Sequence, residues 1–175
     1  MMQYGKPHSV WLSLGTNMAQ REEHLRNAVK ALDEYDGIRI RKESDWFDTE
    51  PWGLVDQPAF LNMAVEIETE LNPLELLNAV KSIERMLGRG PGTHWGPRVI
   101  DIDIVLYEDR ILETPELTVP HKQFRKRAFV LEPLAQIAGD IIDPVTHATI
   151  AELAARPEAA GKVRRIAPSQ HIGTD

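Results

Sequence analysis

The segment that most constrains the fold of this chain is an apolar stretch that carries two carboxylates, residues 99–107 (VIDIDIVLY). Side chains alternate between the two faces of a β-strand, so the even-numbered residues from Ile100 to Leu106 should share one face. Asp101 and Asp103 should share the other face, with their Cβ atoms roughly 6–7 Å apart. Because the even-numbered face is so apolar, we expect the strand to be central in its sheet, where paired acids require a compensating cation.

The two aspartates indicate a site for divalent metal ions. Ions in two-metal sites lie about 3.5–4 Å apart, which the spacing of the carboxylates accommodates. Oxygen ligands favour Mg²⁺, which proteins usually share with the phosphates of a substrate. The alternative is an exposed strand face with alternating acids, a common pattern at sheet edges. The apolar opposite face makes this alternative the weaker one.

The elements up to this strand follow the order β-α-β-β-α-β. Apolar spacing predicts them in turn: a strand at 10–14, a helix over 25–32 that ends by Gly37, strands at 38–47 and 60–68, and a helix from Asn72-Pro73 to Gly88. This order predicts an α+β fold of the ferredoxin-like type, with an antiparallel sheet and both helices on one face. We expect Phe60 and Asn62 to lie beside the aspartates on the face that these helices leave open.

The rest of the chain is predicted to add short elements to a single domain. These are short strands at 111–112 and 117–119, a helix from Ala128, and a short helix over 150–155. Residues 156–175 are expected to form a poorly ordered tail. A length of 175 residues favours one domain over 1–175, with its core between about residues 8 and 155.

Composition argues against several classes of protein. The chain has no cysteine, which excludes disulfides and thiolate metal sites. It has no run of about 18 apolar residues that could span a membrane, and its start lacks the apolar region of a signal peptide, so we expect a cytoplasmic protein. A net charge of −7 argues against general nucleic-acid binding. An anionic substrate would therefore need a local basic cluster.

Two groups of basic residues could form such a cluster. Arg89 and Arg98 bracket a Gly-Pro-Gly loop and are interpreted as clamps on phosphoryl oxygens, although arginines are commonly surface residues. His121, Lys122 and Arg127 form the second group, for which a solvated helix start is an equal alternative.

Three aromatic residues could enclose a flat ring: Trp95, Phe60 and Phe129. Aromatic residues more often belong to a core. Asn62, on the same strand face as Phe60, could form hydrogen bonds with ring nitrogens. A buried side-chain amide without a partner is disfavoured, so a planar polar ligand would satisfy it.

Taken together, these motifs resemble the 6-hydroxymethyl-7,8-dihydropterin pyrophosphokinase family over residues 10 to about 150. The resemblance rests on Leu14-Gly15-Thr16-Asn17, Asp56-Gln57-Pro58 followed by Phe60-Leu61-Asn62, Ile83-Glu84, Gly88-Arg89, the segment 95–103 (WGPRVIDID), and Thr118-Val119-Pro120-His121 with Arg127 and Phe129. It implies transfer of the terminal pyrophosphate of ATP to the hydroxymethyl oxygen of the pterin, with release of AMP, in folate biosynthesis.

The resemblance also implies roles for individual residues. Asp101 and Asp103 would hold two Mg²⁺ ions along the triphosphate, and Arg89 and Arg98 would stabilise the moving group. The implied ATP site contains Lys81, Glu84, Arg98, Ile104, Thr118, His121, Lys122 and Arg127. The implied pterin site contains Thr49, Trp52, Gly53, Phe60, Asn62, Trp95 and Phe129, with the ring between the two phenylalanines. We expect a monomer whose partners are these two substrates, without nucleic acid or membrane.

Two alternatives stay open. A palm-like nucleotidyl transferase also presents acids on a βαββαβ sheet, but it would release pyrophosphate instead of AMP. An RNA-binding module of the same topology is the non-enzymatic alternative. The net charge of −7 and the lack of an aromatic-basic segment of the RNA-binding type argue against it.

Overall fold

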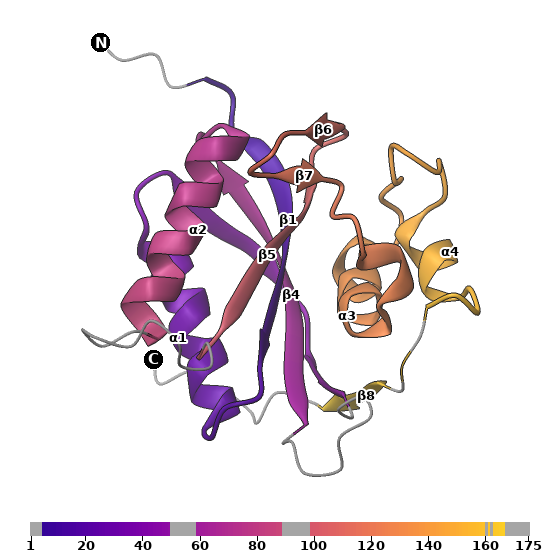
Figure 1. Ribbon diagram of the computed structural model, residues 1–175, viewed down its shortest axis with the longest axis horizontal. Helices are drawn as coiled ribbons and strands as arrows, with labels where there is room; N and C mark the ends of the chain where they lie inside the picture. The colour runs from indigo at the N-terminus through magenta and orange to yellow at the C-terminus, as the bar shows by residue number, and fades with distance from the viewer. Residues whose placement is uncertain (1–4, 50–58, 89–98, 160, 162, 167–175) are drawn as a thin grey trace.

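The computed structural model describes residues 5–49, 59–88, 99–159, 161 and 163–166. A six-stranded sheet runs through the molecule, with helices α1 and α2 on one side and α3 and α4 on the other (Figure 1). The first elements are β1 (His8–Thr16), α1 (Arg21–Glu34), β2 (Ile38–Glu43), β3 (Trp46–Thr49), β4 (Phe60–Thr69), α2 (Pro73–Gly88) and β5 (Asp101–Tyr107). The later elements are β6 (Leu112–Glu113), β7 (Thr118–Val119), the 3₁₀ helix η1 (Phe124–Lys126), α3 (Ala128–Ala138), α4 (Ile150–Ala154) and β8 (Val163–Ile166).

The sheet order confirms the predicted α+β fold of the ferredoxin-like type. β5 pairs with β1, β1 pairs with β4, and β4 pairs with both β2 and β3, always antiparallel. The strand predicted over 38–47 is divided at Ser44 and Asp45, so β2 and β3 pair with successive parts of β4. Together they occupy one position in the sheet, which preserves the βαββαβ order. In the described ranges, no helix is long and apolar enough to cross a membrane.

Helix α2 begins where the sequence predicts, with a reciprocal pair of capping bonds. The Asn72 side chain accepts a hydrogen bond from the Glu75 amide at 2.9 Å, and the Glu75 carboxylate accepts one from the Asn72 amide at 2.9 Å. Two of the helix's unpaired N–H groups are thereby satisfied. Pro73 at the first helical position has no N–H group to satisfy. These bonds fix the start of α2 at Asn72.

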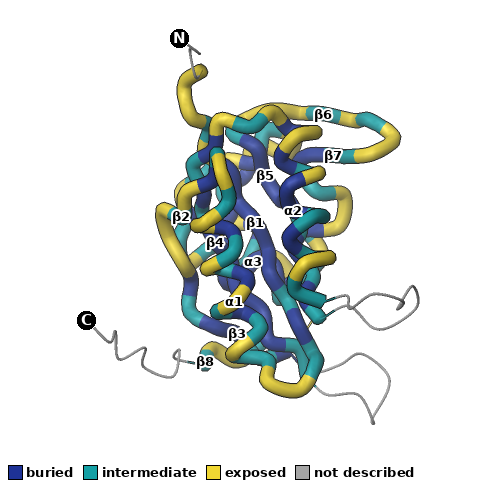
Figure 2. Tube along the Cα trace, turned by 90° about the vertical axis from the view of Figure 1, so that its left-hand side faces the viewer, coloured by how far each residue is buried: buried dark blue, intermediate teal, exposed yellow. Residues whose placement is uncertain are grey.

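One continuous apolar core joins α1 and α2 to the sheet. Figure 2 views the molecule from this side, with the strands behind the two helices. The strands contribute alternate residues to this core, among them Leu12, Leu14, Met63, Val65 and Ile102, all at most 2% exposed. The opposite side chains of the same strands are left for the second face of the sheet.

Helix α3 covers part of that second face. Trp11 of β1, Ala64 of β4 and Leu106 of β5 pack with the buried face of α3 in a second core. The sequence predicts this helix from Ala128, and it continues through Pro133 to Ala138. Helix α3 therefore covers only part of the second face.

The expectation that the acidic strand is central in the sheet is wrong. Among the described residues, β5 pairs with β1 alone and forms an edge of the sheet. Its apolar face is buried because α1 and α2 cover it, not because strands flank it on both sides. The apolarity of one strand face thus reports what packs on that face, and does not report how many neighbours the strand has.

The expected alternation along this strand also fails at its end. Trp11 pairs with Leu106 and Leu12 pairs with Ile104, so Val105 is an extra residue, a β-bulge. After the bulge the faces exchange: Leu106 joins the core under α3, and Tyr107 joins the core under α2. Leu106 therefore does not share a face with Ile100, Ile102 and Ile104 as predicted.

The predicted tail is partly wrong as well. Val163–Ile166 forms β8 and pairs antiparallel with β3, with Ile166 opposite Trp46. Arg164 pairs with Asp48 at 3.6 Å, and Arg165 pairs with Asp45. The segment pairs with the edge of β3 and forms two ion pairs, although its sequence lacks a strong apolar pattern. Residues 167–175 of the predicted tail lie outside the described residues.

A buried ion pair holds η1 against the loop that follows α3. The Asp143 carboxylate, with 0% of its side chain exposed, accepts bonds from Arg125 Nε at 2.6 Å and Nη2 at 2.9 Å. Thr146 and the Val145 amide also donate to it. Burial raises the pKa of Asp143, but these hydrogen bonds outweigh it and lower the pKa from 3.8 to about 2.

We predict that Asp143→Asn lowers the free energy of unfolding by roughly 2 kcal/mol at pH 7. Because the folded carboxyl has the lower pKa, its stabilising contribution is complete above pH 3.8 and is lost as the pH falls through about 2. Urea unfolding at a series of pH values checks this. The difference between wild type and variant should narrow below pH 3.8, and a constant difference would contradict the assignment.

Candidate active site

Five residues from three adjacent strands form a polar patch on the second sheet face, apart from the residues that pack with α3. We call it the polar floor: Ser13 and Gly15 of β1, Asn62 of β4, and Asp101 and Asp103 of β5. Gly15 lies opposite Asn62 on one side and opposite Asp101 on the other. Ser13 lies opposite Asp103 in the next row. The sheet register therefore brings together the predicted metal carboxylates and the predicted ring-binding amide.

The two aspartates lie on one strand face, as predicted. Both are only partly exposed, while the intervening Ile102 points into the core on the other face. In the part of the chain that the structure describes, no group of three or more His, Cys, Asp or Glu residues could hold a metal ion. Two carboxylates fit a hard divalent cation only if phosphate or water oxygens complete its shell, which is how Mg²⁺ is usually bound beside nucleotides.

His121 stands next to Asp103 because the bulge in β5 holds it there. The backbone carbonyl of Val105 accepts a hydrogen bond from the His121 amide at 2.9 Å. His121 Nδ1 accepts one from the Gln123 amide at 3.1 Å, which places the ring proton on Nε2. Burial lowers the pKa of His121 below 6.5, the Asp103 carboxylate raises it, and Arg127 lowers it. The net effect lowers the pKa of His121, which favours the neutral ring with its proton on Nε2.

The other residues of the second basic group have separate surroundings. Arg127 immediately precedes α3, and its guanidinium lies 5.6 Å from the centre of the Phe129 ring. This cation–π geometry places a positive charge against an aromatic face, close enough to His121 to lower its pKa. Lys122 is exposed to solvent. Arg125 is bound to Asp143, so it is not part of the candidate site.

The pterin-side residues Thr49, Phe60 and Asn62 come together where β3 meets β4. Asn62 is 3% exposed and Thr49 is 4% exposed. The Asn62 amide nitrogen donates to the Thr49 hydroxyl at 2.8 Å, which fixes the amide in one orientation. Phe60 pairs with Thr49 across the two strands and is partly exposed. The predicted amide is therefore buried and already oriented by a neighbouring strand.

Three of the residues assigned to ATP lie along the outer edge of β5 and not on the polar floor. The Glu84 carboxylate accepts a hydrogen bond from the Ile102 amide at 2.9 Å and lies 3.3 Å from the Lys81 ammonium. The backbone of Ile104, two residues on, faces the same edge. Its side chain is 4% exposed in the core under α1 and α2, so only its backbone could contact a nucleotide. Thr118, on the short strand β7, is partly buried.

Several predicted site residues lie outside the described residues: Trp52, Gly53, Arg89, Trp95 and Arg98. Two residues of the polar floor were missed in the sequence, Ser13 and Gly15. The signal for them was present, because they alternate with the apolar residues Leu12 and Leu14 of β1. The alternation of faces that predicts the position of Asp101 and Asp103 on β5 also predicts, on β1, that Ser13 and Gly15 lie on the second face.

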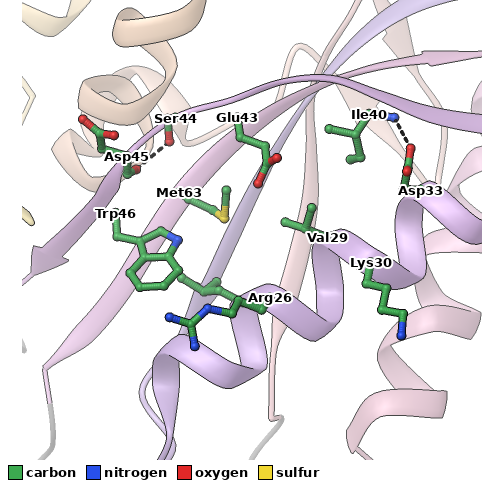
Figure 3. Close-up of a pocket in the computed structure, with 11 residues that line it drawn as sticks. Arg26, Val29, Lys30, Asp33, Ile40, Glu43, Ser44, Asp45, Trp46 and Met63 are labelled. Carbon is green, nitrogen blue, oxygen red and sulfur yellow. Dashed lines mark hydrogen bonds between the residues drawn. The ribbon is translucent and has the colours of Figure 1, made fainter. Parts of the chain in front are cut away.

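A groove of about 640 Å³ lies on the other side of the sheet, between α1 and the strands β2 and β3 (Figure 3). Trp46 and Arg26 lie together at one end of it, with the guanidinium 5.1 Å from the ring centre. None of the predicted site residues lines this groove. Its size alone does not make it the reaction site, because it lacks the carboxylate pair and the oriented amide.

We predict that Glu84→Leu leaves the Ile102 amide without its hydrogen-bond acceptor and destabilises the fold by about 1–3 kcal/mol, the cost of a buried donor without a partner. Hydrogen exchange at the Ile102 amide should become faster, while exchange in β4 should change little. Arg85→Leu, at the next and exposed position of α2, is the matched control. Unchanged exchange at Ile102 would show that the Glu84 bond does not protect the edge of β5.

Comparisons with known proteins converge on one group. A family model described as 7,8-dihydro-6-hydroxymethylpterin-pyrophosphokinase matches residues 11–139, a range that contains every predicted site residue. The 2-amino-4-hydroxy-6-hydroxymethyldihydropteridine pyrophosphokinase of Bacillus subtilis is 44% identical over 138 residues, covering 79% of this chain and 83% of that protein. The protein of the same name from Methylorubrum extorquens is 44% identical over 151 residues, covering 86% and 94%.

A solved structure supports the same fold. The HPPK-DHPS protein of Plasmodium falciparum matches with a TM-score of 0.68 at 17% identity. The match covers 87% of this chain but only 44% of the Plasmodium chain, so this chain spans less than half of that protein.

Proposed function

The chain belongs to the 7,8-dihydro-6-hydroxymethylpterin-pyrophosphokinase family, and from this premise we propose that the polar floor and the outer edge of β5 are the two halves of its active site. The activity of the family is pyrophosphoryl transfer to hydroxymethyldihydropterin in folate biosynthesis, with ATP as donor. What remains to be proposed is which residues of this chain carry each part of that reaction.

One observation supports the proposal most: Asn62, Gly15 and Asp101 occupy one row across three strands. Neighbouring strands lie about 4.7–4.9 Å apart, so the ring-binding amide and the first metal carboxylate are separated by roughly 10 Å. A pterin that binds Asn62 would extend its hydroxymethyl group along this row toward Asp101. The acceptor oxygen would then lie beside the phosphates.

The pterin half would consist of Thr49, Asn62, Phe60 and Phe129. The Asn62 amide is held by Thr49 and offers its remaining polar atoms to the ring. Phe60 and Phe129 would enclose the ring from β4 and α3. Trp52, Gly53 and Trp95 are proposed as further pterin contacts from the sequence alone.

The nucleotide half would follow the outer edge of β5. We place the base beside the backbone of Ile104, between the Glu84–Lys81 pair and the segment from Thr118 to His121. Neutral His121 would donate from Nε2 to a phosphate oxygen, and Arg127 would add positive charge there. Lys122, Arg89 and Arg98 are proposed as phosphate contacts from the sequence alone, with Arg89 and Arg98 on the moving group.

Asp101 and Asp103 would hold two Mg²⁺ ions, which would neutralise the triphosphate. The protein's own part is to hold the hydroxymethyl oxygen in line with the β-phosphorus of ATP. The bond between this oxygen and the β-phosphorus would form as the hydroxyl proton passes to solvent, and the bond from the β-phosphorus to the bridging oxygen would break, so that AMP leaves with that oxygen. Such a transfer depends mainly on positioning and on stabilisation of charge.

The test of the function is incubation with ATP, Mg²⁺ and 6-hydroxymethyl-7,8-dihydropterin, followed by analysis of the products. AMP and the pyrophosphorylated pterin should appear in equal amounts. Release of pyrophosphate in place of AMP would favour the nucleotidyl transferase alternative. The same reaction without a divalent metal ion tests the Mg²⁺ requirement, since full turnover in chelator would contradict it.

We predict that Asp101→Ala and Asp103→Ala each reduce AMP release by about 100-fold or more, because the charge on the triphosphate is then not neutralised. Both side chains are partly exposed on an edge strand, so the far-UV circular dichroism spectrum should stay unchanged. Asp109→Ala, in the exposed turn after β5, is the matched control. Normal turnover by either variant would reject the metal assignment.

A further inference from the structure

Gly15 is the only residue of the polar floor without a side chain, and it lies at the centre of the Asn62–Gly15–Asp101 row. An added Cβ atom at this position would lie 2.6 Å from Asn62 Oδ1 and 3.6 Å from Asn62 Cγ. A separation of 2.6 Å is far inside van der Waals contact. The Asn62 side chain therefore occupies space that any other residue at position 15 would fill.

Asn62 has little freedom to move out of the way. Its side chain is 3% exposed, and its amide nitrogen is bound to the Thr49 hydroxyl at 2.8 Å. A displaced Asn62 would lose this bond while staying buried, which is unfavourable for a polar group. The absence of a side chain at Gly15 is thus linked directly to the position of the Asn62 oxygen, which leans over β1 toward Asp101.

We propose that Gly15 is a positioning residue for the pterin, acting through Asn62. The bare backbone at Gly15 lets the amide oxygen lie over β1, where it accepts a hydrogen bond from an N–H group of the ring. This inference rests on the proposed pterin role of Asn62.

The experiment is a double-mutant cycle with four proteins: wild type, Gly15→Ala, Asn62→Ala, and the variant that carries both changes. The dissociation constant of 6-hydroxymethyl-7,8-dihydropterin is measured by fluorescence titration, and that of a non-hydrolysable ATP analogue by calorimetry. Gly5→Ala is the matched control, because nothing lies within 4 Å of a Cβ atom added there.

Gly15→Ala should weaken pterin binding by about 10-fold or more and change the affinity for the ATP analogue less than about 2-fold. In the Asn62→Ala background the same change should weaken pterin binding by less than about 2-fold, since the clashing atoms are gone. A loss that is equal in both backgrounds overturns the inference. A loss shared equally by the pterin and the ATP analogue also overturns it.

The cycle separates this inference from the proposed function. If Asn62→Ala leaves pterin affinity unchanged, the proposed role of Asn62 fails, whatever Gly15→Ala does. If Gly15→Ala alone does not fold, the test is made on the melting temperatures of Asn62→Ala and of the double variant. The double variant should then fold with a melting temperature near that of Asn62→Ala, and its failure to fold contradicts the coupling between the two residues.

Discussion

The hydrogen bond from the His121 amide to the Val105 carbonyl is the interaction on which the candidate site most depends. The extra residue at Val105 does two things at once. It changes the face of the residues that follow it, so that Leu106 packs with α3 while Tyr107 packs in the core with α2. It also leaves a carbonyl for the segment that carries His121 and, further on, Arg127. This one irregularity therefore places the segment that carries His121 beside the polar floor.

Much of the site followed from alternation and spacing in the sequence. Local sequence patterns predict the shared face of Asp101 and Asp103 and the position of Asn62 opposite the apolar row of β4. The capped start of α2 is likewise predicted from a few neighbouring residues. The βαββαβ order was accessible for the same reason. The ion pair of Arg125 was not accessible in this way, because its partner Asp143 lies 18 residues away in the chain.

The features that sequence reasoning missed depend on contacts between distant segments. Residues 104–107 are all apolar, so nothing local marks the bulge at Val105 or the change of face at Leu106. The same apolarity made β5 seem central, although helices cover it and only β1 pairs with it among the described residues. β8 is held by ion pairs with Asp45 and Asp48. Such ion pairs between distant segments produce no periodic pattern in the sequence. Sequence patterns report the surroundings of a side chain well, and the partners of a strand edge poorly.

The edge position of β5 has a consequence for the behaviour of the protein in a crowded cell. A strand edge with free N–H and C=O groups can act as a template for strands of other chains, and proteins usually block such edges with charge or with a covering segment. Here the Ile102 amide donates a hydrogen bond to Glu84, and the Val105 carbonyl accepts one from the His121 amide. These two bonds lie on either side of Ile104. The backbone at Ile104, where we propose that the nucleotide binds, is therefore a stretch of free edge too short for another strand to pair with. If the nucleotide binds where we propose, the same few atoms would serve substrate recognition and resistance to aggregation.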